Sequence, residues 1–387
     1  MLRDEMQEHL TRKILPFWEN LADRENGGTV GYMGEDLTPV RDADKGCILN
    51  SRILWTFSTA ARMMPEMGYS EHADRAYDFL SRFEDRENGG VFWSVTFDGK
   101  PSDTTKHTYC QAFAIYGLAA YYRLTGKEEA LEKAYRLFDV IEEKCADPDG
   151  YGEAYKADFS PESNEKLSEN GVMASRTMNT LLHVLEAYTE LYKARKDGRV
   201  RTAGTAALQR FLGTFYNPEK RRLEVFCDRE YRSLLDMQSY GHDIEAGWLL
   251  WDSAVTFLPV REQKPYREMC LDLVWSVYER AFTERGLKNE CVNGVTDETR
   301  VWWVQAETML GFADAWRLTG ECVWLSALMI QWETIRNLII DPREGGEWHQ
   351  SVSADGIPSG KPMVEEWKCP YHNGRMCLRL MEANLPV

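Results

Sequence analysis

Several features that would assign a protein to a membrane or to a polyanionic partner are missing from this sequence. It contains no run of about 18 or more apolar residues, and its opening residues, MLRDEMQEHL, are charged where a secretory signal has an apolar core. Positive charge is also scarce, because 46 Lys and Arg face 62 Asp and Glu, which gives a net charge of −16. We therefore expect a cytoplasmic protein that binds neither nucleic acid nor a membrane.

The common motifs for cofactors are also absent. The nine cysteines include no Cys-x-x-Cys pair, which favours reduced core thiols over a disulfide framework or a zinc site. Neither GxGxxG nor GxxxxGKS/T is present, so no dinucleotide or phosphate loop is predicted, and no HExxH pattern indicates zinc. These absences predict a protein that needs no cofactor and no metal ion.

Turn-rich segments recur along the chain at intervals of roughly 58 to 70 residues. Each combines turn residues, a short apolar or aromatic run and a second turn, which indicates a β-hairpin. No linker rich in Pro, Gly and Ser interrupts the series, so we expect a single domain over residues 1–387. The six segments begin at Asp23, Asp85, Asp147, Asn217, Thr283 and Asp341.

Two kinds of helix alternate between the predicted hairpins. The helix before a hairpin is amphipathic and charged, as in 6–22, 71–84 and 128–143, and this pattern indicates an outer position. The helix after a hairpin is apolar nearly all round, which indicates burial. Six helices of each kind predict an all-α fold, an (α/α)6 barrel with short β-hairpins between outer and inner helices. The predicted inner helices are 47–63, 109–124, 177–192, 242–258, 301–318 and 371–383.

Polar residues gather near the beginnings of these buried helices, at the mouth into which all six hairpins lead. A polar group on a buried helix costs free energy unless it is paired or faces the lumen. The sequence therefore predicts a pocket at this mouth, with the polar residues Arg52, Tyr109, Gln111, Asn179, His183, His242, Glu245, Glu307, His372 and Arg375.

His242 and His372 each begin a predicted inner helix. The helix dipole disfavours the imidazolium form there, and an imidazole can both take and give a proton near neutral pH. We interpret both as acid–base groups, against the alternative that they only cap helix ends. His183 stands alone on an apolar helix and could be a core residue, but Asn179 one turn earlier on the same face favours the site.

Two charged residues on the inner helices have alternative interpretations. Arg52 needs an anionic partner, which is either a fixed carboxylate or charge that develops on a substrate. Glu245 lies three residues after His242, where it could orient that imidazole or close a capping box, or do both. His242, Glu245 and another histidine could also hold a metal ion, but their spacing is not specific, so we rank this alternative below acid–base chemistry.

The sequence has 13 tryptophans, which is many for 387 residues. An indole face suits the C–H surface of a sugar, and four tryptophans lie near the predicted mouth. Because no phosphate loop or dense cluster of Lys and Arg is present, we expect the pocket to take a neutral sugar. The four tryptophans are Trp248, Trp302, Trp303 and Trp367.

Eight runs, in order along nearly the whole chain, resemble the N-acylglucosamine 2-epimerase superfamily. The resemblance implies an (α/α)6 barrel that epimerises a sugar at C2 without a cofactor. Within the superfamily the YHNGR ending is similar to that of the cellobiose 2-epimerases, and N-acylglucosamine 2-epimerase or mannose isomerase is the alternative. The runs are KGCILNSRILW, DTTKHTY, SENG, TMNTLLHVLEAYTELY, SYGHDIEA, TRVWWVQAE, EGGEW and WKCPYHNGRMC.

The resemblance also implies an activity and residue roles. The activity is reversible epimerisation at C2 of the reducing-end glucose of a β-1,4-linked disaccharide, cellobiose and lactose among them, through a cis-enediolate. His242 and His372 match the acid–base pair, His183 matches the ring-opening histidine, and Arg52 matches the arginine that holds the enediolate oxygen. The positions expected to bind or orient the sugar are Tyr109, Asn179, Glu245, Trp248, Trp303, Glu307 and Trp367.

Two functions of other classes could use the same pocket. A glycoside hydrolase needs two carboxylates across the scissile bond, and Glu245 with Glu307 are the candidates. That function would leave His242 and His372 without a purpose. A sugar-binding protein without catalysis needs the tryptophans but no bases. We therefore expect the epimerase, with a small oligosaccharide as its partner.

Overall fold

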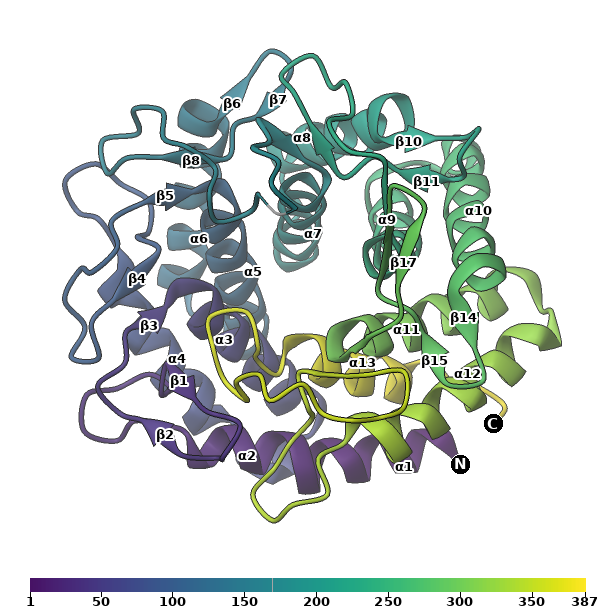
Figure 1. Cartoon of the computed structure of the whole chain (residues 1–387). Helices are drawn as coiled ribbons and strands as arrows, with labels where there is room; N and C mark the ends of the chain where they lie inside the picture. Colours follow the sequence, from purple (N-terminus) through teal and green to yellow (C-terminus); the bar gives the residue numbers. More distant parts are fainter. Residues whose placement is uncertain (169) are drawn as a thin grey trace.

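The computed structural model describes residues 1–168 and 170–387, so Glu169 of the SENG run lies outside the described residues. Six helices form an inner ring in which each contacts the next and the last returns to the first (Figure 1). Most of their residues are buried, as their apolar sequences predict. The inner helices are α3 (Cys47–Met63), α5 (Thr108–Thr125), α7 (Met178–Ala194), α9 (Tyr240–Phe257), α11 (Trp302–Thr319) and α13 (Tyr371–Glu382).

A second layer of helices surrounds this ring (Figure 1). Each outer helix packs mainly on the inner helix that precedes it in the chain, and α1 packs on α13, which closes the circle. The Leu2 amide donates to the Val387 carbonyl over 3.0 Å at this closure. The predicted (α/α)6 barrel is confirmed. The outer helices are α1 (Leu2–His9) with its continuation α2 (Leu15–Asn20), α4 (Ser70–Leu80), α6 (Glu128–Val140), α8 (Gly198–Arg210), α10 (Lys264–Ala281) and α12 (Cys322–Thr334).

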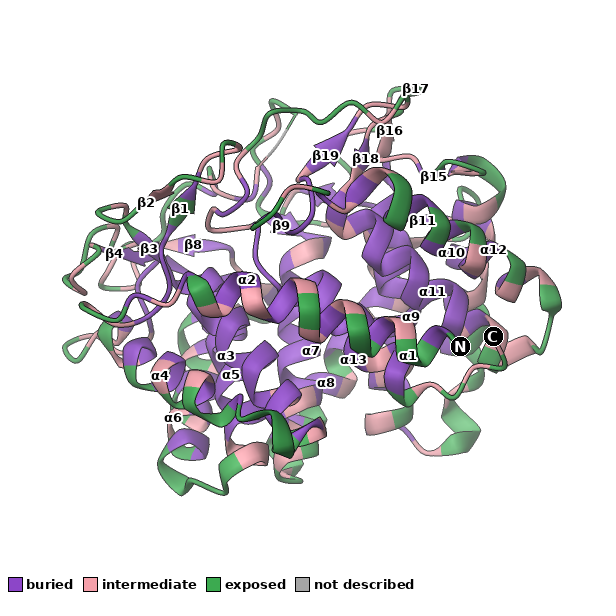
Figure 2. Cartoon of the chain, turned by 90° about the horizontal axis from the view of Figure 1, so that it is seen from below, coloured by how far each residue is buried: buried purple, intermediate pink, exposed green. Residues whose placement is uncertain are grey.

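The outer helices bury one face only, which is why their sequences are amphipathic (Figure 2). In α4 four of the five buried residues, Ala73, Ala76, Tyr77 and Leu80, recur at spacings of three and four, and Phe79 widens the buried face. Several outer helices contain or end in a wider π-helical turn: Leu10–Ile14 between α1 and α2, Ile141–Cys145 after α6, Phe211–Phe215 after α8 and Ile335–Ile339 after α12. The 3-10 turns are Pro65–Met67, Ser81–Phe83 and Val260–Glu262.

The connections from outer to inner helices lie together at one end of the barrel (Figure 2). Some of their strands pair within one connection, as the hairpin prediction requires. These pairs are β1 (Tyr32–Met33) with β2 (Pro39–Val40), β6 (Ala146–Asp147) with β7 (Gly150–Tyr151), β10 (Tyr216–Asn217) with β11 (Arg222–Leu223), β14 (Phe282–Thr283) with β15 (Gly286–Leu287), and β16 (Glu290–Val292) with β17 (Val295–Asp297).

Other strands, just before the inner helices, pair with the following connection, which the hairpin prediction did not include. A bridge between Met33 and Val364 joins the first connection to the last, so the connections form a ring around the mouth. The alternation of apolar and polar residues predicts a strand but does not predict the strand with which it pairs. Here that pairing depends on closure of the barrel, which brings neighbouring connections together. The pairs are β3 (Lys45–Gly46) with β4 (Ser94–Val95), β5 (Lys106–His107) with β8 (Ala154–Tyr155), β9 (Arg176–Thr177) with β12 (Phe226–Cys227), β13 (Met237–Ser239) with β16, and β18 (Arg300–Val301) with β19 (Ser351–Val352).

Buried lysines fix the first two connections. Lys45 Nζ donates to Asp23 Oδ2 over 2.7 Å, and Lys106 Nζ donates to Asp85 Oδ2 over 2.8 Å. The two aspartates begin identical DRENGG runs, so the same contact recurs in two repeats. A buried ammonium without such a partner would carry a large desolvation cost, and each lysine therefore holds its connection against the start of an inner helix.

Gln111 does not line the predicted pocket. Its side-chain amide exchanges hydrogen bonds with the backbone N–H and C=O of Val91, at 2.7 and 2.8 Å. Gln305 makes the same pair of bonds to Leu287 at the equivalent place on α11. The prediction for Gln111 is wrong because a loop backbone, rather than a ligand, satisfies this buried amide.

Two expectations from composition can be compared with the structure. No described helix is both long and apolar enough to cross a membrane. All nine cysteines are free thiols, and most of them are buried in the core as predicted.

Candidate active site

A cavity of about 340 Å³ opens at the mouth of the barrel, where the inner helices begin. Most of the predicted site residues are brought together there. Glu307 and Trp248 are not among the lining residues and lie behind them. Arg375, also predicted for the pocket, does not line it. The predicted residues that line the cavity are Arg52, Tyr109, Asn179, His183, His242, Glu245, Trp302, Trp303, Trp367 and His372.

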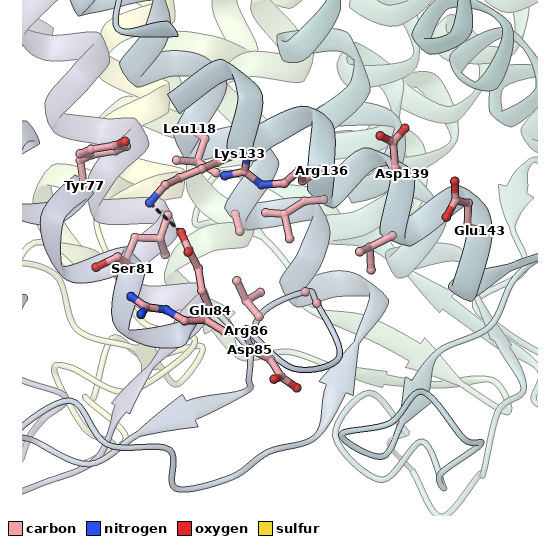
Figure 3. A pocket seen from close by; sticks show the side chains of 17 residues that line it. Tyr77, Ser81, Glu84, Asp85, Arg86, Leu118, Lys133, Arg136, Asp139 and Glu143 are labelled. Carbon is pink, nitrogen blue, oxygen red and sulfur yellow. Dashed lines mark ion pairs between the residues drawn. The ribbon is translucent and has the colours of Figure 1, made fainter. Parts of the chain in front are cut away.

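A larger cavity of about 490 Å³ lies between α4 and α6 (Figure 3). Its lining is mixed, with apolar residues such as Leu118 beside charged ones, of which Lys133 Nζ pairs with Glu84 Oε1 at 2.7 Å. Its lining contains no histidine and none of the predicted site residues. Since a neutral imidazole can accept a proton and then return it, we place the chemistry in the cavity at the mouth, which three histidines line.

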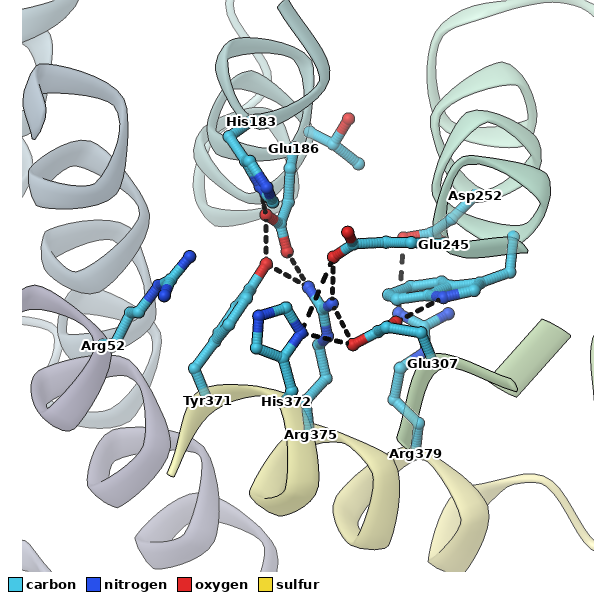
Figure 4. Close-up of polar contacts among 12 residues, drawn as sticks. Arg52, His183, Glu186, Glu245, Asp252, Glu307, Tyr371, His372, Arg375 and Arg379 are labelled. Atoms are coloured by element: carbon cyan, nitrogen blue, oxygen red, sulfur yellow. Dashed lines mark hydrogen bonds and ion pairs between the residues drawn. The ribbon is translucent and has the colours of Figure 1, made fainter. Parts of the chain in front are cut away.

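Arg375 on α13 lies at the centre of a buried group of carboxylates (Figure 4). One of its terminal nitrogens donates to Glu245 Oε1 and to Glu307 Oε1, at 2.7 Å each, and the other donates to Glu186. These carboxylates come from α9, α11 and α7. One guanidinium therefore joins four of the six inner helices beneath the cavity.

Two of the three histidines are held by carboxylates of this group. His183 Nδ1 lies 2.8 Å from Glu186 Oε2, and His372 Nδ1 lies 2.7 Å from Glu307 Oε1. A carboxylate accepts a hydrogen bond from Nδ1–H, so the proton stays on Nδ1 and the lone pair of Nε2 is free to accept another proton. Burial lowers the pKa of His183, and burial together with the charge of Arg52 lowers the pKa of His372 well below its ordinary value. Both imidazoles are therefore neutral at neutral pH.

His242 has a different partner, because its Nδ1 lies 2.8 Å from Oγ of Ser239. Burial, with a smaller effect of His183, lowers the pKa of His242 to about 3, so this imidazole is neutral as well. Its ring centre is 4.8 Å from that of Trp303, and Trp303 is 5.4 Å from the ring of His372. The two predicted acid–base groups thus contact one indole from two different helices.

The sequence-based interpretations of Glu245 are both wrong. Its Oε1 accepts from Arg375 and lies 3.8 Å from Nδ1 of His372, whereas Nδ1 of His242 contacts Ser239. No side chain caps the start of α9, so no capping box forms there. The buried positive charge of Arg375 decides where this carboxylate lies, because an unpaired buried carboxylate would be very costly.

Trp248 supports the site from behind rather than lining the cavity. Its indole Nε1 donates to Glu307 Oε2 over 2.9 Å, and its ring lies 4.6 Å from the guanidinium carbon of Arg375. Glu307 in turn accepts from His372 Nδ1. The indole therefore helps to fix the carboxylate that orients His372.

The carboxyl groups around Arg375 differ in their affinity for protons. Burial and the neighbouring charge of Glu307 raise the pKa of Glu245 to about 8. Burial also opposes ionisation of Glu186, but Arg375 and the hydrogen bond from His183 lower the pKa of that carboxyl to about 2. One cation cannot balance three buried carboxylates, so a proton retained on Glu245 at neutral pH reduces the excess negative charge.

Arg52 has polar and aromatic contacts but no fixed counterion. Its terminal nitrogens donate to Tyr109 Oη at 2.9 Å and to the Trp367 carbonyl at 3.3 Å, and its guanidinium carbon lies 4.2 Å from the Phe113 ring centre. In the described part of the chain no carboxylate pairs with it, and its Nε is buried without a partner. Oδ1 of Asn179, also on the cavity wall, is buried without a partner too.

The residues present do not fit a metal ion well. Glu245, Glu307 and His372 each offer one ligand atom, and these atoms lie within 4.8 Å of one another. His242, which the sequence suggested as a ligand, is not part of this group. Arg375 already donates to the same two carboxylate oxygens, and its permanent positive charge takes the place of a cation.

Among the site residues that were not predicted from the sequence are three that hydrogen-bond to a site histidine or to its carboxylate partner. A signal for one of them was available, because each of the three site histidines is followed three positions later by a charged residue, and these charged residues form one buried group. No comparable pattern marks the others, whose contacts depend on how the helices meet. The three are Glu186, Ser239 and Tyr371, and the last donates to Glu186 Oε2 at 2.5 Å.

Known proteins resemble this chain over its whole length. The family model for N-acylglucosamine 2-epimerase (GlcNAc 2-epimerase) matches residues 28–373. A cellobiose 2-epimerase from Eubacterium cellulosolvens is 46% identical, with 100% of both chains covered. Among solved structures, a sugar epimerase from a ruminal bacterium matches with a TM-score of 0.98 at 43% identity, covering 100% of each chain. The cellobiose 2-epimerase of Bacillus thermoamylovorans B4167 matches with 0.96 at 40%, covering 98% of this chain and 99% of that one. The chain therefore belongs to the N-acylglucosamine 2-epimerase family.

Proposed function

We propose that the protein is an isomerase that epimerises the reducing-end glucose of cellobiose at C2, reversibly, to give 4-O-β-D-glucosyl-D-mannose. Lactose is proposed to react in the same way. One observation carries the proposal. Two neutral imidazoles, His242 and His372, line the same cavity as the guanidinium of Arg52, which has no carboxylate partner among the described residues. Relatives named cellobiose 2-epimerase support the choice of disaccharide.

Ring opening must come first, because the C2 proton of a sugar is acidic only in the open-chain aldehyde. His183 is the proposed acid–base group for this step. It lines the cavity, and Glu186 holds its Nδ1, so Nε2 can take the proton of the O1 hydroxyl and return a proton to the ring oxygen.

Proton transfer at C2 then uses the other two histidines. One imidazole takes the C2 proton, and the electrons of the broken C–H bond form the cis-enediolate between C1 and C2. Rotation about the C2–C3 bond presents the opposite face, to which the second imidazole delivers a proton that it has taken from solvent, and the first imidazole returns the C2 proton to solvent. Two bases on separate helices, α9 and α13, account for inversion, whereas a single base would mainly return the starting sugar.

Arg52 is proposed to stabilise the enediolate oxygen. A buried cation without a fixed counterion is costly in the empty site and becomes favourable when negative charge develops beside it. The partly exposed faces of Trp303 and Trp367 are proposed to hold the sugar rings, and Tyr109 and Asn179 to bind hydroxyl groups. Glu307 is proposed to position His372 directly, supported by Trp248, and Glu245 is proposed to act through Arg375.

The carboxylate geometry argues against the glycoside hydrolase alternative. Glu245 Oε1 and Glu307 Oε1 accept from the same nitrogen of Arg375, and Glu307 does not line the cavity. Hydrolases need carboxyl groups about 5–10 Å apart on opposite sides of the scissile bond. Two carboxylates bound to one guanidinium nitrogen do not leave room for a glycosidic bond between them.

The remaining parts of the proposal concern the setting of the enzyme. We propose one catalytic domain over residues 1–387 that acts in the cytoplasm without nucleic acid or membrane partners. The net charge of −16 supports this choice, since it repels polyanions.

Incubation with cellobiose, followed by separation of the sugars, tests the proposed function. We expect glucosyl-mannose to form and to reach the same equilibrium from either epimer, with no free glucose. Release of glucose would instead identify a hydrolase. Binding without any conversion would identify a sugar-binding protein.

Chelators are expected to leave the activity unchanged. Two of the three candidate ligand groups, Glu245 and Glu307, already accept hydrogen bonds from Arg375, and no proposed step needs a metal ion. The epimerisation rate should therefore be the same before and after dialysis against EDTA. Loss of activity with EDTA, followed by recovery on adding a divalent cation, would contradict this mechanism.

Arg52→Lys is expected to lower kcat strongly. An ammonium is a point charge that cannot reproduce the planar fork of a guanidinium, so transition-state stabilisation should fall by about 2 kcal/mol or more. Steady-state kinetics on cellobiose measure this effect. Arg62→Lys, an exposed site on the same helix α3, is the matched control and should have wild-type kcat. A folded Arg52→Lys variant with unchanged kcat would make Arg52 a structural residue.

A further inference from the structure

Ser239 occupies the N-cap position of α9, but its hydroxyl does not cap the helix. A serine at this position normally accepts a hydrogen bond from the backbone N–H two or three residues later, here Gly241 or His242. Its backbone is extended there, with φ −86° and ψ 101°, as a capping residue requires. The side chain nevertheless bonds the imidazole of His242 at 2.8 Å instead.

Two other helices of the same barrel begin with a residue of the same kind, and in both the side chain does cap the helix. Thr177, in the equivalent place before α7, accepts from the Thr180 N–H at 3.1 Å. Asp197, before the outer helix α8, accepts from the Arg199 N–H at 2.7 Å. Ser239 therefore gives up a common stabilising contact at a single place, next to a proposed acid–base group. Buried polar groups that depart from the local rule in this way are found mainly at functional sites.

The surroundings hold the Ser239 hydroxyl in place. Ser239 is 4% exposed, and its residue pairs with Glu290 in the β13–β16 ladder, which fixes the direction of its side chain. Ser239 and His242 both line the cavity, and no hydrogen bond joins Nε2 of His242 to another described residue. The contact at Nδ1 therefore turns Nε2 towards the place where a sugar would lie.

We propose that Ser239 is a positioning residue for His242. Its hydroxyl contacts Nδ1 of this imidazole, where the other two histidines have a carboxylate. A carboxylate accepts only, so His183 and His372 keep their proton on Nδ1. A hydroxyl both donates and accepts, so Ser239 holds the ring of His242 whichever nitrogen carries the proton. The inference rests on the proposed function, since it concerns one of the two proton-transfer groups.

The Ser239→Ala variant tests the assignment against simple helix capping. Because Ser239→Ala loses no capping bond, we expect its melting temperature to fall less than that of Asp197→Ala. The Asp197→Ala variant removes a helix cap far from the cavity, so it should keep wild-type kcat. The Ser239→Ala kcat should fall roughly tenfold, the effect of one typical hydrogen bond, with KM little changed. Ser239→Thr, which keeps the hydroxyl, should recover most of the rate.

Deuterium wash-in at C2 in D2O gives a readout that a structural role would not change. Ser239→Ala should slow exchange from one epimer only, the same epimer whose exchange is lost in His242→Asn. Three results would overturn the assignment. Ser239→Ala could slow exchange at C2 equally from both epimers, it could keep a wild-type kcat, or Ser239→Thr could be as slow as Ser239→Ala. If the wild-type protein neither interconverts the two epimers nor introduces deuterium at C2 of either, the proposed function itself fails and the assignment fails with it.

Discussion

Replacement of His242 or His372 with Asn should nearly abolish epimerisation, since inversion needs a base on one face of C2 and an acid on the other. General acid–base groups contribute about 10²–10⁴-fold, so both losses should be large and the residual rates still measurable. The surviving imidazole can still exchange the C2 proton of the epimer whose hydrogen faces it. One variant should therefore retain slow deuterium wash-in with the glucose-type sugar, and the other should retain it with the mannose-type sugar.

Two further variants complete this test. His183→Asn should slow wash-in from both epimers alike, because ring opening precedes either proton abstraction. His72→Asn, the same substitution on the outer helix α4, should have wild-type rates. Symmetric loss of exchange from both epimers in the His242 and His372 variants would contradict the two-base assignment.

Arg375→Met should destabilise the fold by about 3–5 kcal/mol, because it leaves three buried carboxylates without their cation. Denaturant unfolding followed by circular dichroism measures the loss. Arg379→Met, one turn further along α13, is the matched control. Arg379 pairs with Asp252 at 3.5 Å, and its side chain is 33% exposed, so its removal should cost only about 0–1 kcal/mol. Equal effects of the two substitutions would contradict the central role of Arg375.

The loss in Arg375→Met should also depend on pH. Arg375 lowers the pKa of Glu186 to about 2, against the effect of burial, and it opposes the raised pKa of Glu245. Without this cation, burial should raise the folded-state pKa values of these carboxyls above their unfolded values. Stability is then retained at low pH and lost as the pH rises through the folded-state values, so the deficit should be larger at about pH 8 than at about pH 5. A deficit that shrinks as the pH rises would contradict this reading.

The barrel could be predicted because the hydrophobic pattern of each helix on its own indicates whether that helix is buried in the inner layer or lies in the outer one. An inner helix such as α5 is apolar on nearly all sides, whereas in an outer helix such as α4 apolar residues recur with the helical period and form one face. The layer of each helix therefore follows from its own sequence. Strand partners could not be predicted in the same way. β3 pairs with β4 from the next connection, and that contact exists only when neighbouring repeats stand side by side.

The site shows the same division between local and long-range information. His242 and His372 could be identified because each begins a helix in a sequence that is otherwise apolar. The partner of each imidazole could not, since Glu307 reaches His372 from a helix 65 residues earlier. The interpretation of Glu245 was wrong for the same reason, because its partner also comes from another helix. Its spacing from His242 is right for a contact, but the charge of Arg375 across the barrel outweighs that proximity.

The most direct test of the account is the isotope content of both sugars early in a reaction in D2O. Cellobiose carrying ordinary hydrogen at C2 is incubated with the wild-type protein and stopped at low conversion, and each epimer is read by NMR. Two bases predict a glucosyl-mannose product with deuterium at C2, while the recovered cellobiose still carries ordinary hydrogen. A product that retains the original hydrogen, or cellobiose that gains deuterium as fast as product forms, would show that one base acts on both faces and would contradict the account.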